Sequence, residues 1–186
     1  IGANIGLYSC YAAKKNLCNV YAFEPSVFNL EWLARNIFLN NLVKKIVVIP
    51  IPLTKIISQN TLNFSSTEWS GALTTFGQSY GHDGKDLKKV FEFSTLGMSM
   101  NDVKKLLKIS QPDYIKIDVD GIEHLILKGA TDTLKSAESL LIEVNDNFIK
   151  QARDTEEYLT KSGFKLKQKR HSEIIAKSEK FSSFYN

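Results

Sequence analysis

The most constraining feature of the sequence is a glycine-containing segment, Gly2-Ala3-Asn4-Ile5-Gly6, with Glu24 about 20 residues further on. Glycines between a strand and a helix let the backbone approach a ligand where a Cβ would clash, and the following helix presents unpaired N–H groups. An acidic residue at the carboxyl end of the second strand reaches ribose hydroxyls. Because residues 16–23 have the composition of that strand, Glu24 is predicted at its end. The two parts together predict a site for an adenosine-bearing cofactor.

The composition of the loop favours one such cofactor over another. A dinucleotide site binds a pyrophosphate by helix dipole and close backbone approach, and it usually has the pattern G-x-G-x-x-G. The loop here is G-A-N-I-G and lacks the middle glycine. S-adenosylmethionine has no phosphate and carries a sulfonium, so it requires a tight turn with acidic or carbonyl groups nearby. The loop therefore favours S-adenosylmethionine.

Strand and helix signals alternate along the chain, as a doubly wound α/β fold requires. The segment 113–119 is apolar on both faces, as a central parallel strand should be. We therefore predict a mostly parallel, Rossmann-like sheet with an antiparallel edge at its C-terminal end. The predicted helices are 5–15, 25–39, 99–108, 123–134 with an interruption near Gly129, and 149–161. The predicted strands are 16–23, 45–49, 60–64, 90–95, 113–119 and 139–144, with 164–169 and 173–177 as a closing hairpin.

Apolar residues at helical spacing predict which sides of the first two helices face the core. They are Leu7, Tyr11 and Ala12 on the first helix, and Phe28, Trp32, Leu33 and Phe38 on the second.

The position of a polar residue in this fold indicates whether it is a candidate for ligand binding, because ligands bind outside the carboxyl ends of the strands where the strand order switches. Glu24 is expected to bind ribose, although a carboxylate there also stabilises the dipole of the helix that follows. The segments expected around one crevice are 2–6, Glu24, 118–123 and 143–146.

Asp118, Glu123 and Glu143 are the candidate catalytic residues. Asp118 ends a buried strand, where an unpartnered carboxylate is costly, so it would contact the methionine amino group, orient an acceptor hydroxyl or bind a metal. Glu123 opens a helix, whose dipole alone also explains an acid there. His82 and His124 are alternative bases. Since no full set of metal ligands can be identified, no metal is predicted.

Five segments of the chain resemble the FkbM-type family of S-adenosylmethionine-dependent methyltransferases, and they occur in order from residue 1 to about residue 144. The segment 115–123 is the most specific. Members of this family have a complete first strand with an Asp two residues before the first motif glycine, whereas this chain begins at Ile1. We therefore expect an N-terminally truncated fragment with the first strand largely missing. The matching segments are I-G-A-N-I-G (1–6), A-F-E-P-S (22–26), I-K-I-D-V-D-G-I-E (115–123), L-K-G-A (127–130) and L-I-E-V (141–144).

The resemblance implies O-methylation of a hydroxyl on a sugar, glycan, lipid or secondary metabolite. It also places a small glycine-containing segment, here Ser70-Gly71, near the adenine, although a simple turn explains the same residues. Two alternatives stay open: an oxidoreductase that binds NAD or a nucleotide sugar, and a non-catalytic small-molecule-binding domain. The predicted cofactor-binding residues are Gly2, Ala3, Asn4, Gly6, Glu24, Pro25, Ser26, Ser70 and Gly71.

Composition limits the number of domains and the location of the protein less strictly than the motifs limit its fold. With 186 residues, 43% of them hydrophobic, the chain can bury one good core, so residues 1–186 are predicted to form a single domain. No apolar run is long enough to span a membrane, and we expect a cytoplasmic location. The net charge of +4 is a mild excess that suits a solvated face, and no nucleic-acid partner is expected.

Overall fold

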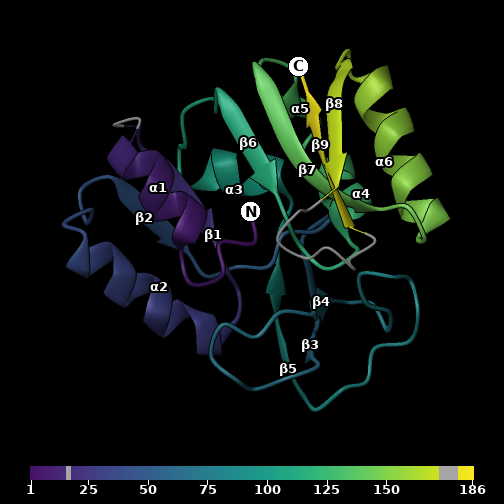
Figure 1. Ribbon diagram of the computed structural model, residues 1–186. Coiled ribbons are helices and arrows are strands. Elements are labelled where there is room, and N and C mark those ends of the chain that lie inside the picture. Colours follow the sequence, from purple (N-terminus) through teal and green to yellow (C-terminus); the bar gives the residue numbers. More distant parts are fainter. Residues whose placement is uncertain (16–17, 172–179) are drawn as a thin grey trace.

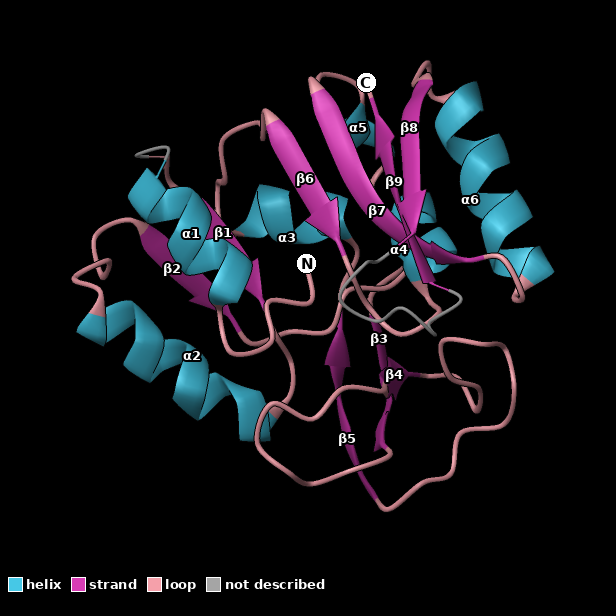
Figure 2. Ribbon diagram, viewed as in Figure 1, coloured by secondary structure: helices cyan, strands magenta, loops and turns pink. Residues whose placement is uncertain are grey.

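The computed structural model describes residues 1–15, 18–171 and 180–186, which form a mixed α/β structure with three groups of strands (Figures 1 and 2). The strands are β1 (Val20–Phe23), β2 (Ile46–Ile49), β3 (Ser58–Phe64), β4 (Thr74–Phe76), β5 (Phe91–Gly97), β6 (Tyr114–Ile117), β7 (Ser139–Asn145), β8 (Leu166–His171) and β9 (Lys180–Tyr185). The helices are α1 (Leu7–Lys15), α2 (Val27–Leu39), α3 (Met100–Leu106), α4 (Glu123–Lys128), α5 (Thr131–Leu134) and α6 (Ile149–Lys161).

The parallel part of the fold consists of two strand pairs, β1 with β2 and β6 with β7. The first residues of the chain connect them through the backbone. Ile1 N donates to Lys116 O at 2.7 Å, and Asp118 N donates to Ile1 O at 3.2 Å. On the other side, Gly2 N donates to Phe23 O at 3.1 Å. The glycine loop therefore starts between the carboxyl ends of β1 and β6, where Figure 1 marks the N-terminus.

The C-terminal edge of the larger sheet is antiparallel, as predicted. Its strand order is β6-β7-β9-β8, and β9 pairs antiparallel with both β7 and β8. β8 corresponds to the predicted strand 164–169, whereas the predicted strand 173–177 lies outside the described residues. The α/β class is confirmed, with parallel pairs β1–β2 and β6–β7 and antiparallel strands beside them.

A third group of strands, β4-β3-β5, is wholly antiparallel and lies below the parallel pairs in Figure 1. β3 and β5 match predicted strands, but β4 was not predicted. The predicted break near Gly129 is real: α4 ends there, and a Cβ on this glycine would lie 2.4 Å from Thr54 O. Close packing against the chain after β2 therefore requires glycine at this position.

The predicted core faces of the first two helices are partly wrong. On α1, Leu7 and Tyr11 are 73% and 62% exposed, and the buried residues are Ser9 and Ala13. Small side chains at these positions let α1 lie close to β1 and β2. On α2, Phe38 is 70% exposed, whereas the buried residues are Asn29, Leu33 and Ile37.

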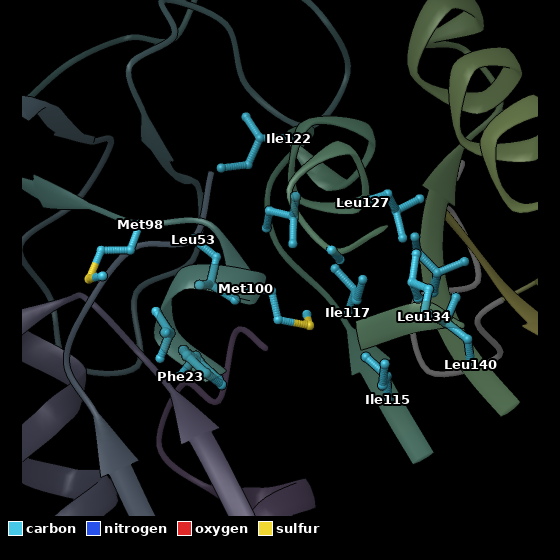
Figure 3. Close-up of a cluster of buried hydrophobic side chains, with 14 of the residues drawn as sticks. Phe23, Leu53, Met98, Met100, Ile115, Ile117, Ile122, Leu127, Leu134 and Leu140 are labelled. Atoms are coloured by element: carbon cyan, nitrogen blue, oxygen red, sulfur yellow. The ribbon is translucent and has the colours of Figure 1, made fainter. Parts of the chain in front are cut away.

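The buried apolar side chains form two clusters. The smaller one lies between α1, α2 and the β1–β2 pair and includes Leu33, Ile37 and Ile46. The larger one runs from Phe23 through α3 to β6, α4 and β7, as Figure 3 shows for ten labelled side chains. Because it spans both strand pairs, this cluster fixes the carboxyl ends of β1 and β6 relative to each other. Within the described ranges, no helix combines the length and apolar character that a membrane span requires.

Candidate functional site

A pocket of about 150 Å³ lies at the carboxyl ends of β1, β2 and β6. One part of its wall is polar and comes from the glycine loop, the start of α2, the β3–β4 connection (residues 65–73) and the chain after β6. The other part is apolar and comes from the chain after β2, β3, β4 and α4. The polar wall includes Gly2, Asn4, Glu24, Asn29, Gly71, Asp118 and Asp120, and the apolar wall includes Ile51, Leu53, Leu62, Phe76, Ile122 and Ile126.

The two glycines of the loop serve different purposes. Gly2 has φ +73°, and a Cβ on it would lie 1.8 Å from Asp118 O, so it lets the chain cross the end of β6 beside the pocket. Gly6 has φ +91°, and a Cβ there would lie 2.6 Å from Leu33 Cδ1. Gly6 therefore allows the loop to approach α2, and it does not line the pocket.

Glu24 is 5% exposed and joins the glycine loop to α2. Its Oε2 accepts a hydrogen bond from Asn4 N at 2.7 Å, and its Oε1 accepts one from Ser26 N at 2.9 Å. Burial raises the pKa of the carboxyl, and these hydrogen bonds from Ser26 and Asn4 oppose the rise. Since each carboxylate oxygen has two acceptor positions, Glu24 keeps acceptor capacity toward the pocket that it lines.

Two further carboxylates line the pocket after β6. Asp118 forms an ion pair with Lys116, whose ammonium lies 4.2 Å from the centre of the Tyr8 ring. Asp120 Oδ2 accepts a hydrogen bond from Thr74 N at 2.9 Å and so ties the start of β4 to the end of β6. Among the described residues that line the pocket, three are acidic and none is lysine, arginine or histidine.

Glu123 lies apart from this pocket, although it follows the same strand. It is 1% exposed, its Oε2 accepts a hydrogen bond from Gln151 Nε2 at 2.6 Å, and burial raises its pKa to about 8. The neighbouring His124 is also buried, which lowers its pKa to about 4, and its Nδ1 has no partner among the described residues. These two side chains belong to the contact between α4 and α6.

The structure brings together only part of the predicted site. Of the catalytic candidates, Asp118 lines the pocket, whereas Glu123 and Glu143 do not. The predicted cofactor residues that line it are Gly2, Asn4, Glu24, Pro25 and Gly71. Those that do not are Ala3, Gly6, Ser26 and Ser70.

The predicted cofactor residues away from the pocket still support its wall. Ala3 N donates to Phe23 O at 2.9 Å, Ser26 N donates to Glu24, and Ser70 Oγ donates to Asn4 Oδ1 at 3.4 Å. Asn29 was not predicted, because nothing in the pattern of α2 distinguishes it from an exposed asparagine. Among the described residues, no group of three or more histidine, cysteine, aspartate or glutamate side chains is arranged to hold a metal ion.

Comparison with known proteins agrees with this description. The strand-end pocket, the glycine loop and the acid after β1 are features of a Rossmann-like α/β fold. The sequence matches the family described as "Methyltransferase FkbM domain" over residues 1–166. The chain therefore belongs to the FkbM methyltransferase family, as its sequence motifs predicted.

One curated relative shows how far the sequence similarity extends. Hexuronic acid methyltransferase AglP of Haloferax volcanii is 24% identical over 145 residues, which cover 78% of this chain and 54% of the relative. The chain thus spans about half the length of this relative.

Two solved structures show the fold. The crystal structure of a methyltransferase FkbM from Methylobacillus flagellatus matches with a TM-score of 0.64 and 18% identity, covering 99% of this chain and 41% of that one. A putative rRNA methylase from Clostridium thermocellum matches with a TM-score of 0.51 and 8% identity, covering 98% and 81%.

Proposed function

We propose that this chain is the cofactor-binding part of an S-adenosylmethionine-dependent O-methyltransferase. The observation that carries the proposal is the charge of the pocket: Glu24, Asp118 and Asp120 line it, and no described lining residue is basic. Such a wall attracts a cationic ligand and repels the pyrophosphate of a dinucleotide. S-adenosylmethionine carries a sulfonium and an ammonium, so the acidic wall of the pocket fits S-adenosylmethionine better than it fits NAD.

The two walls suit different parts of this cofactor. Glu24 would accept hydrogen bonds from the ribose hydroxyls, and the acidic wall as a whole would favour the methionine ammonium. The apolar wall, with Leu53 and Phe76, suits an adenine ring. When bound, S-adenosylmethionine would supply a methyl group on its sulfonium. Gly2 and Asn4 contribute the backbone of the tight loop on which the sulfonium side of the ligand would rest.

The residues of this chain would act mainly by position. Methyl transfer from a sulfonium is an in-line substitution whose barrier falls when donor and acceptor are held in line, so few catalytic side chains are needed. Asp118 is fixed by its ion pair with Lys116, and it is the predicted catalytic carboxylate that lines the pocket. It would orient the acceptor hydroxyl or accept its proton as the new bond forms.

For the acceptor we propose a hydroxyl of a small molecule or glycan, with a sugar as the first choice, because the relative AglP is described as a hexuronic acid methyltransferase. The cytoplasmic location and the single-domain organisation predicted from the sequence are part of the same proposal.

Calorimetry with S-adenosylhomocysteine and with NAD tests the choice of cofactor. We expect S-adenosylhomocysteine to bind and NAD to show no saturable heat. Binding of NAD in preference to S-adenosylhomocysteine would favour the oxidoreductase alternative, and binding of neither would sink the proposal.

Turnover tests the catalytic assignment, with hexuronic acids and neutral sugars as trial acceptors. Asp118→Asn should keep its fold, checked by circular dichroism, and lose about 10²-fold in turnover, the usual scale for a general base. Glu143→Gln is the matched control, because Glu143 does not line the pocket. Equal losses of turnover in the two variants would contradict a catalytic role for Asp118.

A further inference from the structure

Asn29, at the start of α2, is a buried side chain in the wall of the pocket with an acceptor left over. It is 3% exposed and lines the pocket beside Glu24. Its Nδ2 donates to Gly71 O at 3.3 Å and approaches Glu24 Oε1 at 3.5 Å. Its Oδ1 has no hydrogen-bond partner among the described residues. A buried carbonyl without a donor costs free energy, so a side chain of this kind in a pocket wall needs an explanation.

The group that would satisfy this oxygen must carry a hydrogen-bond donor and must reach the corner that Glu24 occupies. Because Asn29 Nδ2 approaches a carboxylate oxygen of Glu24, the two side chains present acceptors at one corner of the pocket. A ribose carries two adjacent hydroxyls, each of which can donate one hydrogen bond. Two neighbouring acceptors at the corner that Glu24 occupies therefore match a ribose diol, the group that an acid after this strand binds.

The ligand reaches Asn29 only if the β3–β4 connection shifts. Asn29 Oδ1 is covered in this structure, and the pocket volume of about 150 Å³ is below the ~300–1,000 Å³ of typical ligand sites. The connection is held by hydrogen bonds at 3.3 Å to Asn29 and 3.4 Å to Asn4, both longer than the usual range. It also contains Ser70 at φ +61° and Leu73 at φ +63°, a region that side chains other than glycine occupy at a cost.

We propose that Asn29 is a further cofactor-binding residue, whose Oδ1 accepts a hydrogen bond from a ribose hydroxyl of the ligand once the β3–β4 connection has moved aside. The proposal rests on the proposed function, since it takes the ligand to be a ribonucleoside with a sulfur-linked amino acid. Glu24 Oε1 is already approached by two donors, Ser26 N and Asn29 Nδ2, so Asn29 Oδ1 would serve as the second acceptor for the diol beside Glu24 Oε2.

A matched pair of variants separates this role from the general effect of removing a buried amide. Asn63 on β3 is also buried and also has an unpartnered Oδ1, and its Nδ2 donates to Gln78 O at 2.9 Å, but it does not line the pocket. By calorimetry with S-adenosylhomocysteine, Asn29→Leu should raise Kd at least tenfold, whereas Asn63→Leu should change it less than twofold. Thermal melting should show similar changes of stability in Asn29→Leu and Asn63→Leu, because each variant removes an unsatisfied buried oxygen together with an Nδ2 that donates to a backbone carbonyl.

Analogues of S-adenosylhomocysteine that lack the 2′ or the 3′ hydroxyl complete the test as a double-mutant cycle. One of the two deoxy analogues should bind the wild-type protein at least tenfold more weakly, and Asn29→Leu should bind that analogue and the parent equally. If Asn29→Leu does not fold, Asn29→Ala takes its place. Two results would overturn the assignment and leave the proposed function standing. One is that the affinity losses from the variant and from the missing hydroxyl are additive, and the other is a wild-type Kd in Asn29→Leu. Failure of the wild-type protein to bind S-adenosylhomocysteine would overturn both.

Tryptophan fluorescence reports the movement of the connection separately. The chain has two tryptophans, Trp32 on α2 and Trp69 on the connection, and their ring centres lie 5.7 Å apart. If the connection moves when the ligand binds, this contact opens and the emission of the wild-type protein should shift to longer wavelength. Trp69→Phe should bind with the same Kd and lack the shift. Binding by calorimetry with unchanged emission would show that the connection does not move, which would overturn the assignment of Asn29 Oδ1 to the ribose.

Discussion

Two buried glutamates follow parallel strands in this protein, and the structure uses them differently. Glu24, after β1, accepts hydrogen bonds from two backbone N–H groups and lines the pocket. Glu123, after β6, accepts a hydrogen bond from the Gln151 side chain and packs between helices. Burial raises the pKa of both carboxyls. A raised pKa therefore does not distinguish the carboxylate in the pocket from the one between helices, and the distinction comes from what each carboxylate faces.

The hydrogen-bond donors to the two carboxylates also differ in how they are held. On the Glu24 side, the donors are fixed by a turn that only glycine can form, because Gly2 has φ +73° and lies against Asp118. On the Glu123 side, the short hydrogen bond at 2.6 Å comes from the Gln151 side chain on α6, and the backbone N–H of Gly121 lies farther away at 3.5 Å. We therefore expect the pocket region to tolerate change less well than the α4–α6 contact.

The largest effect should come from Gly2→Ala. A Cβ would lie 1.8 Å from Asp118 O and would also be placed on a left-handed residue, so the loop and the end of β6 cannot both keep their positions. We expect a loss of more than about 3 kcal/mol in the free energy of unfolding, measured by chemical denaturation.

Gly163→Ala is the control for this prediction. Gly163 has φ +92°, but nothing lies within 4 Å of the position that a Cβ would take there. The variant should therefore lose only the conformational cost of a left-handed alanine, about 1–2 kcal/mol. Similar losses in the two variants would show that the close approach to Asp118 is not what makes Gly2 necessary.

The next effect sharpens the contrast between the two glutamates directly. In Glu24→Gln, an amide NH₂ replaces one oxygen and meets the N–H of Asn4 or Ser26, which leaves a donor unpaired. We expect a loss of about 1–3 kcal/mol in the binding of S-adenosylhomocysteine, which is a rise in Kd of roughly 5- to 150-fold. Glu123→Gln should change Kd less than twofold, because Glu123 does not line the pocket. An equal loss of affinity in Glu123→Gln would show that the two glutamates do not differ in their contribution to binding.

Much of the fold could be predicted from the sequence, because local signals and tertiary structure agree there. The alternation of strands and helices, the break at Gly129 and the antiparallel edge are examples. β4 could not be predicted, because it has three residues and is specified by its pairing with β3 rather than by its own pattern. The exposed Leu7 and Phe38 were placed in the core because apolar spacing does not show which face of a helix meets a sheet.

The candidate site was predictable where residues follow a strand. Glu24 and Asp118 were expected at the pocket, and both line it. Glu123 was expected there too, but the first turn of α4 directs it toward Gln151, a residue 28 positions away that no local pattern connects to it. Asn29 was missed for a similar reason, since its partner Gly71 lies 42 positions away.

The last of the expected effects is a gradual dependence of stability on pH. Burial raises the pKa of Glu123 from 4.5 to about 8, with Asp120 adding to the rise, so the folded protein binds this proton more tightly than the unfolded chain does. The stabilisation is complete below pH 4.5 and is lost as pH rises toward about 8. His124 works in the opposite direction, because its pKa falls from 6.5 to about 4, and its contribution is lost only as pH falls below 6.5.

Between pH 6.5 and about 8, Glu123 should therefore dominate, and the free energy of unfolding should fall by up to about 1.4 kcal/mol per pH unit. Chemical denaturation across this range measures the slope. Glu123→Gln should flatten it, because glutamine resembles the protonated carboxyl and does not titrate, whereas Glu24→Gln should retain it. Burial raises the pKa of Tyr80, and the nearby Glu123 carboxylate adds to the rise, so Tyr80→Phe tests whether the slope depends on both groups. If the pH dependence of the free energy of unfolding is unchanged in Glu123→Gln, another group must bind the proton. A protonated Glu123 would then not be what separates the α4–α6 contact from the pocket.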